Sequence, residues 1–144
     1  MYDRILLPTD GSDGADAALE HAVAQAQAYD ATLHVLYVTN TTYMGSGAAE
    51  ATAVETLRSS GEDILAETVE RLNERGVDVA SKQLEGDPHA TIVEYSEDAD
   101  IDLIVMGTHG RTGLDRYLLG SVTEKVVRTS AVPVLTVSID DAAA

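Results

Sequence analysis

The sequence has no cysteine, only two lysines and no long hydrophobic run among its 144 residues. Without cysteine, disulfides, thiol catalysis and thiolate metal sites are all excluded, and the composition is compatible with a reducing compartment. No apolar stretch reaches transmembrane length, and the first residues enter a strand-like segment without the basic and apolar parts of a signal peptide. These absences predict a soluble cytoplasmic protein that does not enter a membrane.

Positive charge is also scarce, because nine Lys and Arg residues stand against 25 Asp and Glu residues, for a formal net charge of −16. A field of this sign repels nucleic acid and anionic membranes, so neither is an expected partner. The carboxylates are spread from Asp3 to Asp141 and form no acidic tail. Two interpretations stay open: a halophilic surface whose self-repulsion is screened by high salt, or an acidic interaction surface.

Two common phosphate-binding fingerprints are missing. The chain has no G-x-x-x-x-G-K-[ST] sequence, and Gly107-x2-Gly110-x2-Gly113 differs from the G-x-G-x-x-G fingerprint of dinucleotide-binding proteins. The signature set of the protein kinases is absent as well. The sequence therefore argues against a P-loop NTPase, a simple NAD-binding protein and a kinase.

What the sequence does contain is a strand-turn-helix pattern around its glycines. Residues 101–106 form a nearly continuous apolar run, which is typical of a buried parallel strand. Gly107 and Gly110 allow the chain to turn and to approach a ligand without a Cβ in the way. Apolar residues then recur at helical spacing, so Gly120-Ser121 lies in the first turn of a helix whose free N–H groups and dipole attract anions. The pattern predicts a ligand that carries phosphates.

Strands and helices are expected to alternate along the chain. Strands are predicted at 3–8, 32–38, 77–84, 102–107 and 132–138, and helices at 13–29, at about 51–75, after Asp87-Pro88 and after Gly120. An N-cap aspartate followed by proline marks the start of the third helix. The alternation predicts an α/β fold, a mostly parallel sheet covered by helices on both faces, in one domain over residues 1–144.

The glycine spacing resembles that of a known family. Read as G-x2-G-x9-G-[ST] over Gly107, Gly110, Gly120 and Ser121, it is similar to the ATP-binding motif of the universal stress protein family. Segments 5–12, 34–38 and 132–137 are similar to that family's first, second and closing strands, so the resemblance covers essentially the whole chain, with 39–60 its least diagnostic part. It implies a single-domain, open, Rossmann-like sheet of the nucleotide α-hydrolase type, with five parallel strands in the order 3-2-1-4-5. In that order strand 132–138 is an apolar edge, and a homodimer through it is expected.

The same order places the predicted ligand site at the ends of the first and fourth strands, because open α/β sheets bind ligands at such a switch point. Pro8, Thr9 and Asp10 end the first strand, and Met106 and Gly107 end the fourth. Asp10 has two interpretations. It bonds the nucleoside or, through water, a Mg2+ ion on the phosphates, or else it stabilises the turn that follows it.

The resemblance also implies contacts between the parts of ATP and residues of this chain. Val38 corresponds to the adenine contact and Met106 and Gly107 to the ribose contacts, while the phosphate cradle comprises Gly110, Gly120, Ser121 and Val122, with Thr123 as a further hydroxyl. His109 either contacts a phosphate or is an exposed loop residue, and Arg111 pairs either with phosphate or with neighbouring carboxylates. No residue is assigned a catalytic role.

The turn-rich segment 40–47 is either a lid over the nucleotide or a plain loop. The expected function is binding of ATP with Mg2+ in a stress-response or regulatory protein, because the cradle explains binding while no positioned nucleophile or base is evident. The alternative is a slow ATPase or an adenylate-transferring enzyme that uses the same site.

Overall fold

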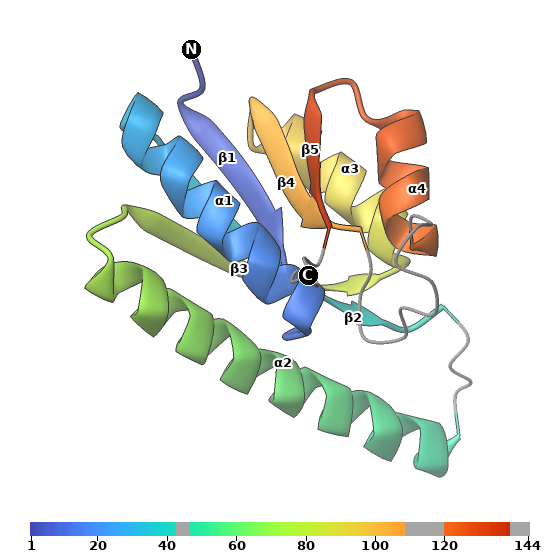
Figure 1. Ribbon diagram of the computed structural model, residues 1–144. Helices are drawn as coiled ribbons and strands as arrows, with labels where there is room; N and C mark the ends of the chain where they lie inside the picture. The colour runs from blue at the N-terminus through green and yellow to red at the C-terminus, as the bar shows by residue number, and fades with distance from the viewer. Residues whose placement is uncertain (43–46, 109–119, 139–144) are drawn as a thin grey trace.

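The described chain forms a five-stranded, all-parallel sheet with helices on both faces (Figure 1), in a computed structural model that describes residues 1–42, 47–108 and 120–138. The strand order is β3-β2-β1-β4-β5, which confirms the order implied by the family resemblance. In chain order the elements are β1 (Arg4–Pro8), α1 (Asp13–Tyr29), β2 (Thr32–Asn40), α2 (Ala48–Glu74), β3 (Val79–Gly86), α3 (Pro88–Asp98), β4 (Leu103–Gly107), α4 (Ser121–Thr129) and β5 (Val134–Val137).

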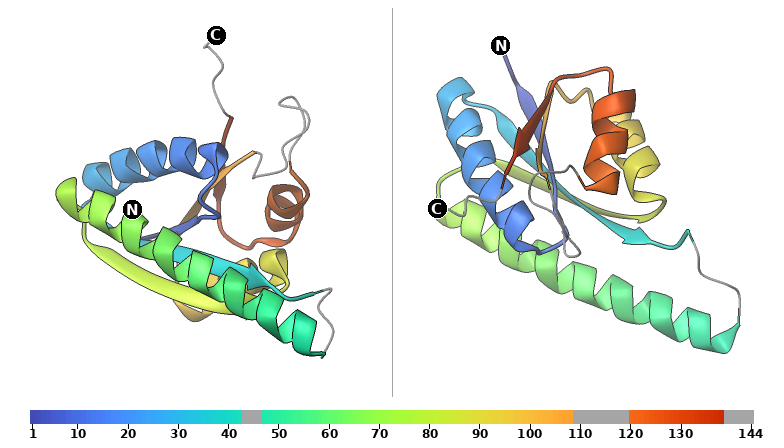
Figure 2. Two further views of the ribbon diagram at one scale, coloured as in Figure 1. Left: turned by 90° about the horizontal axis from the view of Figure 1, so that it is seen from below. Right: turned by 45° about the vertical axis from the view of Figure 1, so that its right-hand side comes forward.

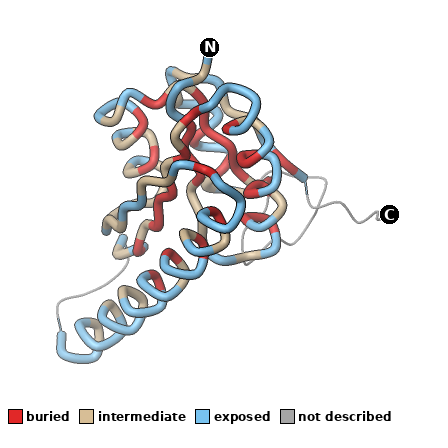
Figure 3. The backbone as a smooth tube through the Cα atoms, turned by 90° about the vertical axis from the view of Figure 1, so that its left-hand side faces the viewer, coloured by how far each residue is buried: buried red, intermediate tan, exposed pale blue. Residues whose placement is uncertain are grey.

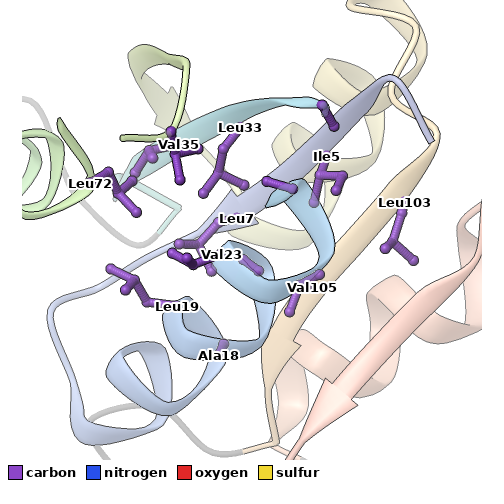
Figure 4. Close-up of a cluster of buried hydrophobic side chains, with 14 of the residues drawn as sticks. Ile5, Leu7, Ala18, Leu19, Val23, Leu33, Val35, Leu72, Leu103 and Val105 are labelled. Atoms are coloured by element: carbon purple, nitrogen blue, oxygen red, sulfur yellow. The ribbon is translucent and has the colours of Figure 1, made fainter. Parts of the chain in front are cut away.

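The helices lie in pairs on the two faces of the sheet. Helices α1 and α2 cover one face, and α3 and α4 cover the other (Figure 2). In β1, Ile5 and Leu7 point toward the first pair and Leu6 points toward the second, and all three are fully buried. Figure 4 shows the core between α1 and the sheet. Burial on both faces explains why the central strands are continuously apolar.

Helix α1 has the bounds that its sequence predicts. Its six expected inward residues are all buried: Ala15, Ala18, Leu19, Ala22, Val23 and Ala26. The helix starts at a local cap, since the Ser12 Oγ accepts a hydrogen bond from the Ala15 N–H at 3.2 Å. It ends at Asp30, whose φ of 55° is left-handed.

The β2–β3 pair is longer at its carboxyl end than expected. β2 continues past residue 38 to Asn40, and β3 covers 79–86 instead of 77–84. The reason is their mutual pairing, since Thr39 and Asn40 lie in register with Glu85 and Gly86. Both strands therefore extend beyond the end of β1, and Gly86 has a φ of 145° where the chain turns into α3.

The predicted bounds of β5 and α2 are also corrected. β5 covers Val134–Val137 rather than 132–138, because Pro133 has no N–H and offers the sheet only its carbonyl, which accepts from the Ile104 N–H at 3.0 Å. α2 begins at Ala48 and leaves one flank exposed along its length (Figure 3). Within the described ranges, no helix is long and apolar enough to cross a membrane.

The start of β1 is tied to the segment before β4. The Asp102 carboxylate accepts hydrogen bonds from the backbone N–H groups of Asp3 and Arg4, at 2.8 and 3.0 Å. The Asp102 N–H in turn donates to the Arg4 carbonyl at 2.8 Å. These bonds fix the amino end of the central strand pair.

Candidate functional site

The carboxyl ends of β1 and β4 lie side by side in the middle of the sheet. The two strands pair in parallel, with Ile5 opposite Leu103 and Leu6 opposite Ile104. After β1 the chain passes to α1 on one face, whereas after β4 it passes to α4 on the other face (Figure 1). This divergence is the switch point at which open α/β sheets bind ligands.

A tight turn after β1 fixes Asp10 at this edge. The Thr9 N–H donates to the Leu36 carbonyl at 2.9 Å, and the Asp10 Oδ1 accepts from the Ser12 N–H at 2.9 Å. Gly11 has a φ of 78°, and its N–H donates to the Thr9 Oγ1 at 3.2 Å. One carboxylate oxygen of Asp10 therefore stabilises the turn, and a ligand role for this residue stays a prediction.

Gly107, at the end of β4, packs directly against the first turn of α1. A Cβ at this position would lie 2.5 Å from the carbonyl oxygen of Gly14 and 2.7 Å from its carbonyl carbon. Because these neighbours are backbone atoms, they cannot rotate away as a side chain could. The glycine is needed for α1 to approach the sheet edge, whatever ligand lies near it.

The chain leaves β4 at Thr108 and returns to the same place at Gly120. The Gly120 N–H donates a hydrogen bond to the Thr108 carbonyl, and the Thr108 N–H donates to the Val137 carbonyl at 2.9 Å. Thr123 is buried, and its hydroxyl donates to the Gly107 carbonyl at 2.8 Å. Gly107 and Gly120, two of the glycines of the motif, therefore lie close together at the end of β4.

The first turn of α4 presents backbone donors without a capping side chain. Its N-cap is Gly120, whereas Ser12 and Asp87 cap α1 and α3 with side-chain oxygens. Ser121 is exposed, and its hydroxyl makes no hydrogen bond within the described part of the chain. The positive end of the α4 dipole therefore lies beside the end of β4 with N–H groups available to an anion.

Val38 and Met106 belong to the core on the α3 and α4 side of the sheet. Val38 is half-buried and Val122 packs against the same cluster, while the Met106 side chain is 6% exposed. Next to Val38, the Thr39 side chain is 1% exposed, and its Oγ1 has no hydrogen-bond partner among the described residues. Sequence reasoning missed Thr39, although a hydroxyl at the end of an apolar strand was a signal for it.

The remaining predicted site residues, His109, Gly110 and Arg111, lie outside the described residues. Lys125 of α4 is a cation close to the motif in sequence, and it is exposed. In the part of the chain that the structure describes, no group of three or more His, Asp or Glu side chains could hold a metal ion.

Comparison with known proteins gives matches along almost the whole chain. The sequence profile of the "Universal stress protein family" matches residues 1–138. The chain is 40% identical over 140 residues to universal stress protein MJ0531 of Methanocaldococcus jannaschii, which covers 95% of this chain and 82% of that protein.

Solved structures give the same result. The structure of MJ0577, another protein of M. jannaschii, is similar with a TM-score of 0.89 and 35% identity, over 95% of this chain and 96% of the other. A universal stress protein solved in complex with cAMP is similar with a TM-score of 0.75 and 29% identity, over 96% and 99% of the two chains. The similarity extends across the central strands and helices alike.

Proposed function

The chain belongs to the universal stress protein family, and from this membership we propose that it binds ATP with Mg2+ at the carboxyl edge of β1 and β4 and acts as a nucleotide-dependent stress-response or regulatory protein. The observation that carries the proposal is the return of Gly120 to the Thr108 carbonyl, beside an uncapped first turn of α4. A triphosphate there meets backbone N–H groups and the positive end of a helix dipole. The cAMP complex of a 29% identical family member supports an adenine nucleotide as the ligand class.

We assign the phosphates to the start of α4. Gly120 leaves room for them, Ser121 offers a hydroxyl that has no partner among the described residues, and Val122 offers its backbone N–H. Thr123 has a positioning role in this assignment, because its hydroxyl already holds the Gly107 carbonyl. Gly110, His109 and Arg111 complete the motif in sequence and stay part of the proposal.

The nucleoside is assigned to the strand ends. Val38 lies two residues before the carboxyl end of β2 and is assigned to the adenine, and the backbone of Met106 and Gly107 at the end of β4 is assigned to the ribose. The turn from Pro8 through Thr9 to Asp10 borders the same edge. These residues come from three adjacent strands of the sheet, which is the usual composition of a switch-point site.

Mg2+ fits this site as a companion of the phosphates. Mg2+ prefers oxygen ligands and keeps several waters, so one carboxylate and a triphosphate suffice to hold it. Asp10 is the carboxylate we assign, acting through water. The ion would offset part of the repulsion between ATP and a chain with a formal net charge of −16.

Calorimetric titration with ATP, ADP, AMP, cAMP and GTP at matched salt, together with a phosphate-release assay, tests this function. We expect ATP to bind and phosphate release to stay near background, because the described residues of the site supply binding groups and the sequence shows no positioned nucleophile or base. Rapid release would favour the ATPase alternative. Absence of binding to every nucleotide would overturn the proposal.

Two variants locate the ligand. Gly120→Val places a branched side chain in the assigned phosphate path, and its φ of −64° is accessible to valine, so the fold should persist. We expect ATP affinity to fall at least about tenfold, which is about 1.4 kcal/mol. Ser121→Ala should cost about 1 kcal/mol of binding free energy. Ser60→Ala, at an exposed serine of α2, is the matched control. Unchanged ATP affinity in folded Gly120→Val protein would contradict the assignment.

We further propose that the chain forms a homodimer through β5 and that its acidic surface is an adaptation to salt. β5 is an edge strand of the described sheet, and an open apolar edge is an aggregation hazard that a two-fold contact removes. The carboxylates exceed the cationic side chains by sixteen, and salt would screen the repulsion among them.

A further inference from the structure

A groove of about 750 Å³ lies between α2 and β3, at the edge of the sheet away from β4 and β5. Leu65, Ala66 and Val69 of α2 line it with apolar atoms, and Ser81 and Gln83 line it from β3. Figure 2 shows α2 running along the length of β3. The groove is therefore separate from the proposed nucleotide site.

Three carboxylates of α2 line the groove without a cationic partner. Glu62, Glu70 and Glu74 form no ion pair within the described part of the chain. The arginines of this helix and of its C-cap are engaged elsewhere: Arg58 with Glu55 and Glu85, Arg71 with Asp16, and the C-cap Arg75 with Glu20. The groove thus combines an apolar lining with uncompensated negative charge, which is complementary to a basic ligand.

The edge of β3 beside the groove has backbone groups available for pairing. Within the described sheet β3 pairs with β2 alone. The carbonyls of Asp78 and Gly86 face β2, because they accept from the N–H groups of Leu33 and Thr41. In a strand, the N–H and C=O groups of every second residue point to the same side. The backbone groups of Ser81 and Gln83 therefore point away from β2, on the side of the groove.

We propose that this groove binds an extended, basic segment of a partner protein, which adds a strand to β3 and directs its cationic side chains at α2. Along a helix, Glu62 and Glu70 are about 12 Å apart and Glu70 and Glu74 about 6 Å apart. In an extended strand these lengths correspond to about four and about two residues. Cations at positions 1, 3 and 7 of a segment would share one face and match the three carboxylates, while the backbone pairs with the edge.

A pair of labelled peptides tests the geometry. Both are extended Thr/Val peptides of equal composition, one with lysines at positions 1, 3 and 7 and the other with lysines at 1, 4 and 7, which divides them between faces. Fluorescence anisotropy at about 0.1 M KCl keeps electrostatic contacts measurable. We expect the first peptide to bind more tightly. Equal affinities, or no binding, would overturn the proposal.

Matched charge variants locate the binding surface. The triple variant Glu62→Gln, Glu70→Gln, Glu74→Gln should raise the dissociation constant on the order of tenfold, because three peripheral ion pairs are lost. The control triple Glu67→Gln, Glu94→Gln, Glu97→Gln changes the net charge equally at exposed positions outside the groove and should have little effect. Equal weakening by both triples would mean non-specific attraction and would contradict the proposal.

A steric variant completes the test without altering charge. Ala66 is exposed in the groove, so Ala66→Trp should fill it and abolish peptide binding. Unchanged binding by this variant would place the peptide elsewhere. Light scattering of the variant Glu62→Gln, Glu70→Gln, Glu74→Gln tests whether the groove binds a second copy of this chain instead. If the oligomeric state of this variant differs from that of the parent chain, the groove is an interface between two copies, and the proposed binding of a partner segment is wrong.

Discussion

At the residue scale, Thr39 of β2 is a buried polar side chain next to the hydrophobic core on the α2 side of the sheet. Its Oγ1 is buried and finds no hydrogen-bond partner in the part of the chain that the structure describes, and an unsatisfied buried hydroxyl lowers stability. Thr39→Val keeps the side-chain shape and removes that group. We expect the free energy of unfolding to rise by about 1 kcal/mol, measured by urea denaturation.

Thr68→Val is the matched control for this substitution. Thr68 is also buried, but its Oγ1 donates to the Ile64 carbonyl at 2.7 Å. Losing a made hydrogen bond should not stabilise the protein. If Thr39→Val were as neutral or as destabilising as Thr68→Val, the Thr39 hydroxyl would have a partner in solution.

His34 gives the fold a pH dependence. Its Nδ1 is hydrogen-bonded to the Tyr95 hydroxyl at 2.8 Å, and burial, followed by the positive charge of Arg4, lowers the pKa of His34 below 6.5. The unfolded chain therefore takes up this proton more readily, so the stability linked to His34 is present above pH 6.5 and is lost as the pH falls below it. We expect His34→Gln to lose less unfolding free energy than the parent between about pH 7 and about pH 5. Parallel pH profiles would contradict the assignment.

Gly107 shows how far a single position could be predicted. Its place after an apolar run correctly indicated the end of a strand, whereas the predicted turn continues into residues outside the described ranges. Its closest neighbour, however, is the backbone of Gly14, which lies in the first turn of α1. Local spacing contains no information about such a contact, because it depends on how closely a helix packs on a distant strand.

At the element scale, Gly61 allows α2 to pack closely on the sheet. A Cβ there would lie 2.5 Å from the Tyr37 ring and 2.6 Å from the Gln83 Nε2, which donates to the Arg58 carbonyl at 2.8 Å. Helix propensity alone favours Gly61→Ala by about 1 kcal/mol. We expect the overpacking cost, about 1–3 kcal/mol, to exceed this gain and lower the thermal midpoint.

Ser60→Ala separates propensity from packing. Ser60 is exposed on the same turn, so its replacement changes helix propensity without a new contact. It should leave the thermal midpoint unchanged or slightly raised. A higher midpoint for Gly61→Ala than for Ser60→Ala would mean that Tyr37 and Gln83 adjust at no cost.

Element bounds were predictable where their signals are local. The limits of α1 follow from Ser12 at its start and the left-handed Asp30 at its end, and Asp87-Pro88 marks the start of α3. The ends of β2 and β3 depend on each other through pairing of Thr39 with Glu85, which no local pattern specifies. The same holds for the candidate site. Its glycine spacing could be recognised in the sequence, but its place in the sheet required the strand order, which only the family resemblance implied.

At the scale of the whole molecule, the proposed salt adaptation predicts a salt-dependent thermal midpoint. Screening lengths fall from about 10 Å at 0.1 M to about 3 Å at 1 M salt, so repulsion among the excess carboxylates weakens. We expect the midpoint to rise steeply with KCl. The triple variant Glu67→Gln, Glu94→Gln, Glu97→Gln has less repulsion to screen and should show a shallower rise. A flat or falling midpoint would contradict the adaptation.

The proposed dimer predicts a specific effect at the outer edge of β5. The carbonyls of Pro133 and Val137 face β4, so the intervening Thr136 directs its N–H outward. Thr136→Pro removes that donor while leaving the β4 ladder intact, and light scattering should then detect monomers. Val134→Lys or Leu135→Lys is a poorer test of the dimer, because both side chains pack against the hydrophobic core of the same chain.

Thr136→Val is the control, since it keeps the N–H and the strand propensity. It should remain a dimer. A folded Thr136→Pro protein that is still dimeric would place the interface elsewhere on the molecule.

Because β1 lies between β2 and β4, β1 of a newly synthesised chain cannot pair along both edges until β4 has also been synthesised. β1 leaves the ribosome before Asp102, which binds its backbone, and before β4, which pairs with it, because both follow about a hundred residues later in the chain. At about 5–20 residues per second this interval is about 5–20 s. Throughout that time one edge of a strand that is fully buried in the finished molecule stays open to other nascent chains.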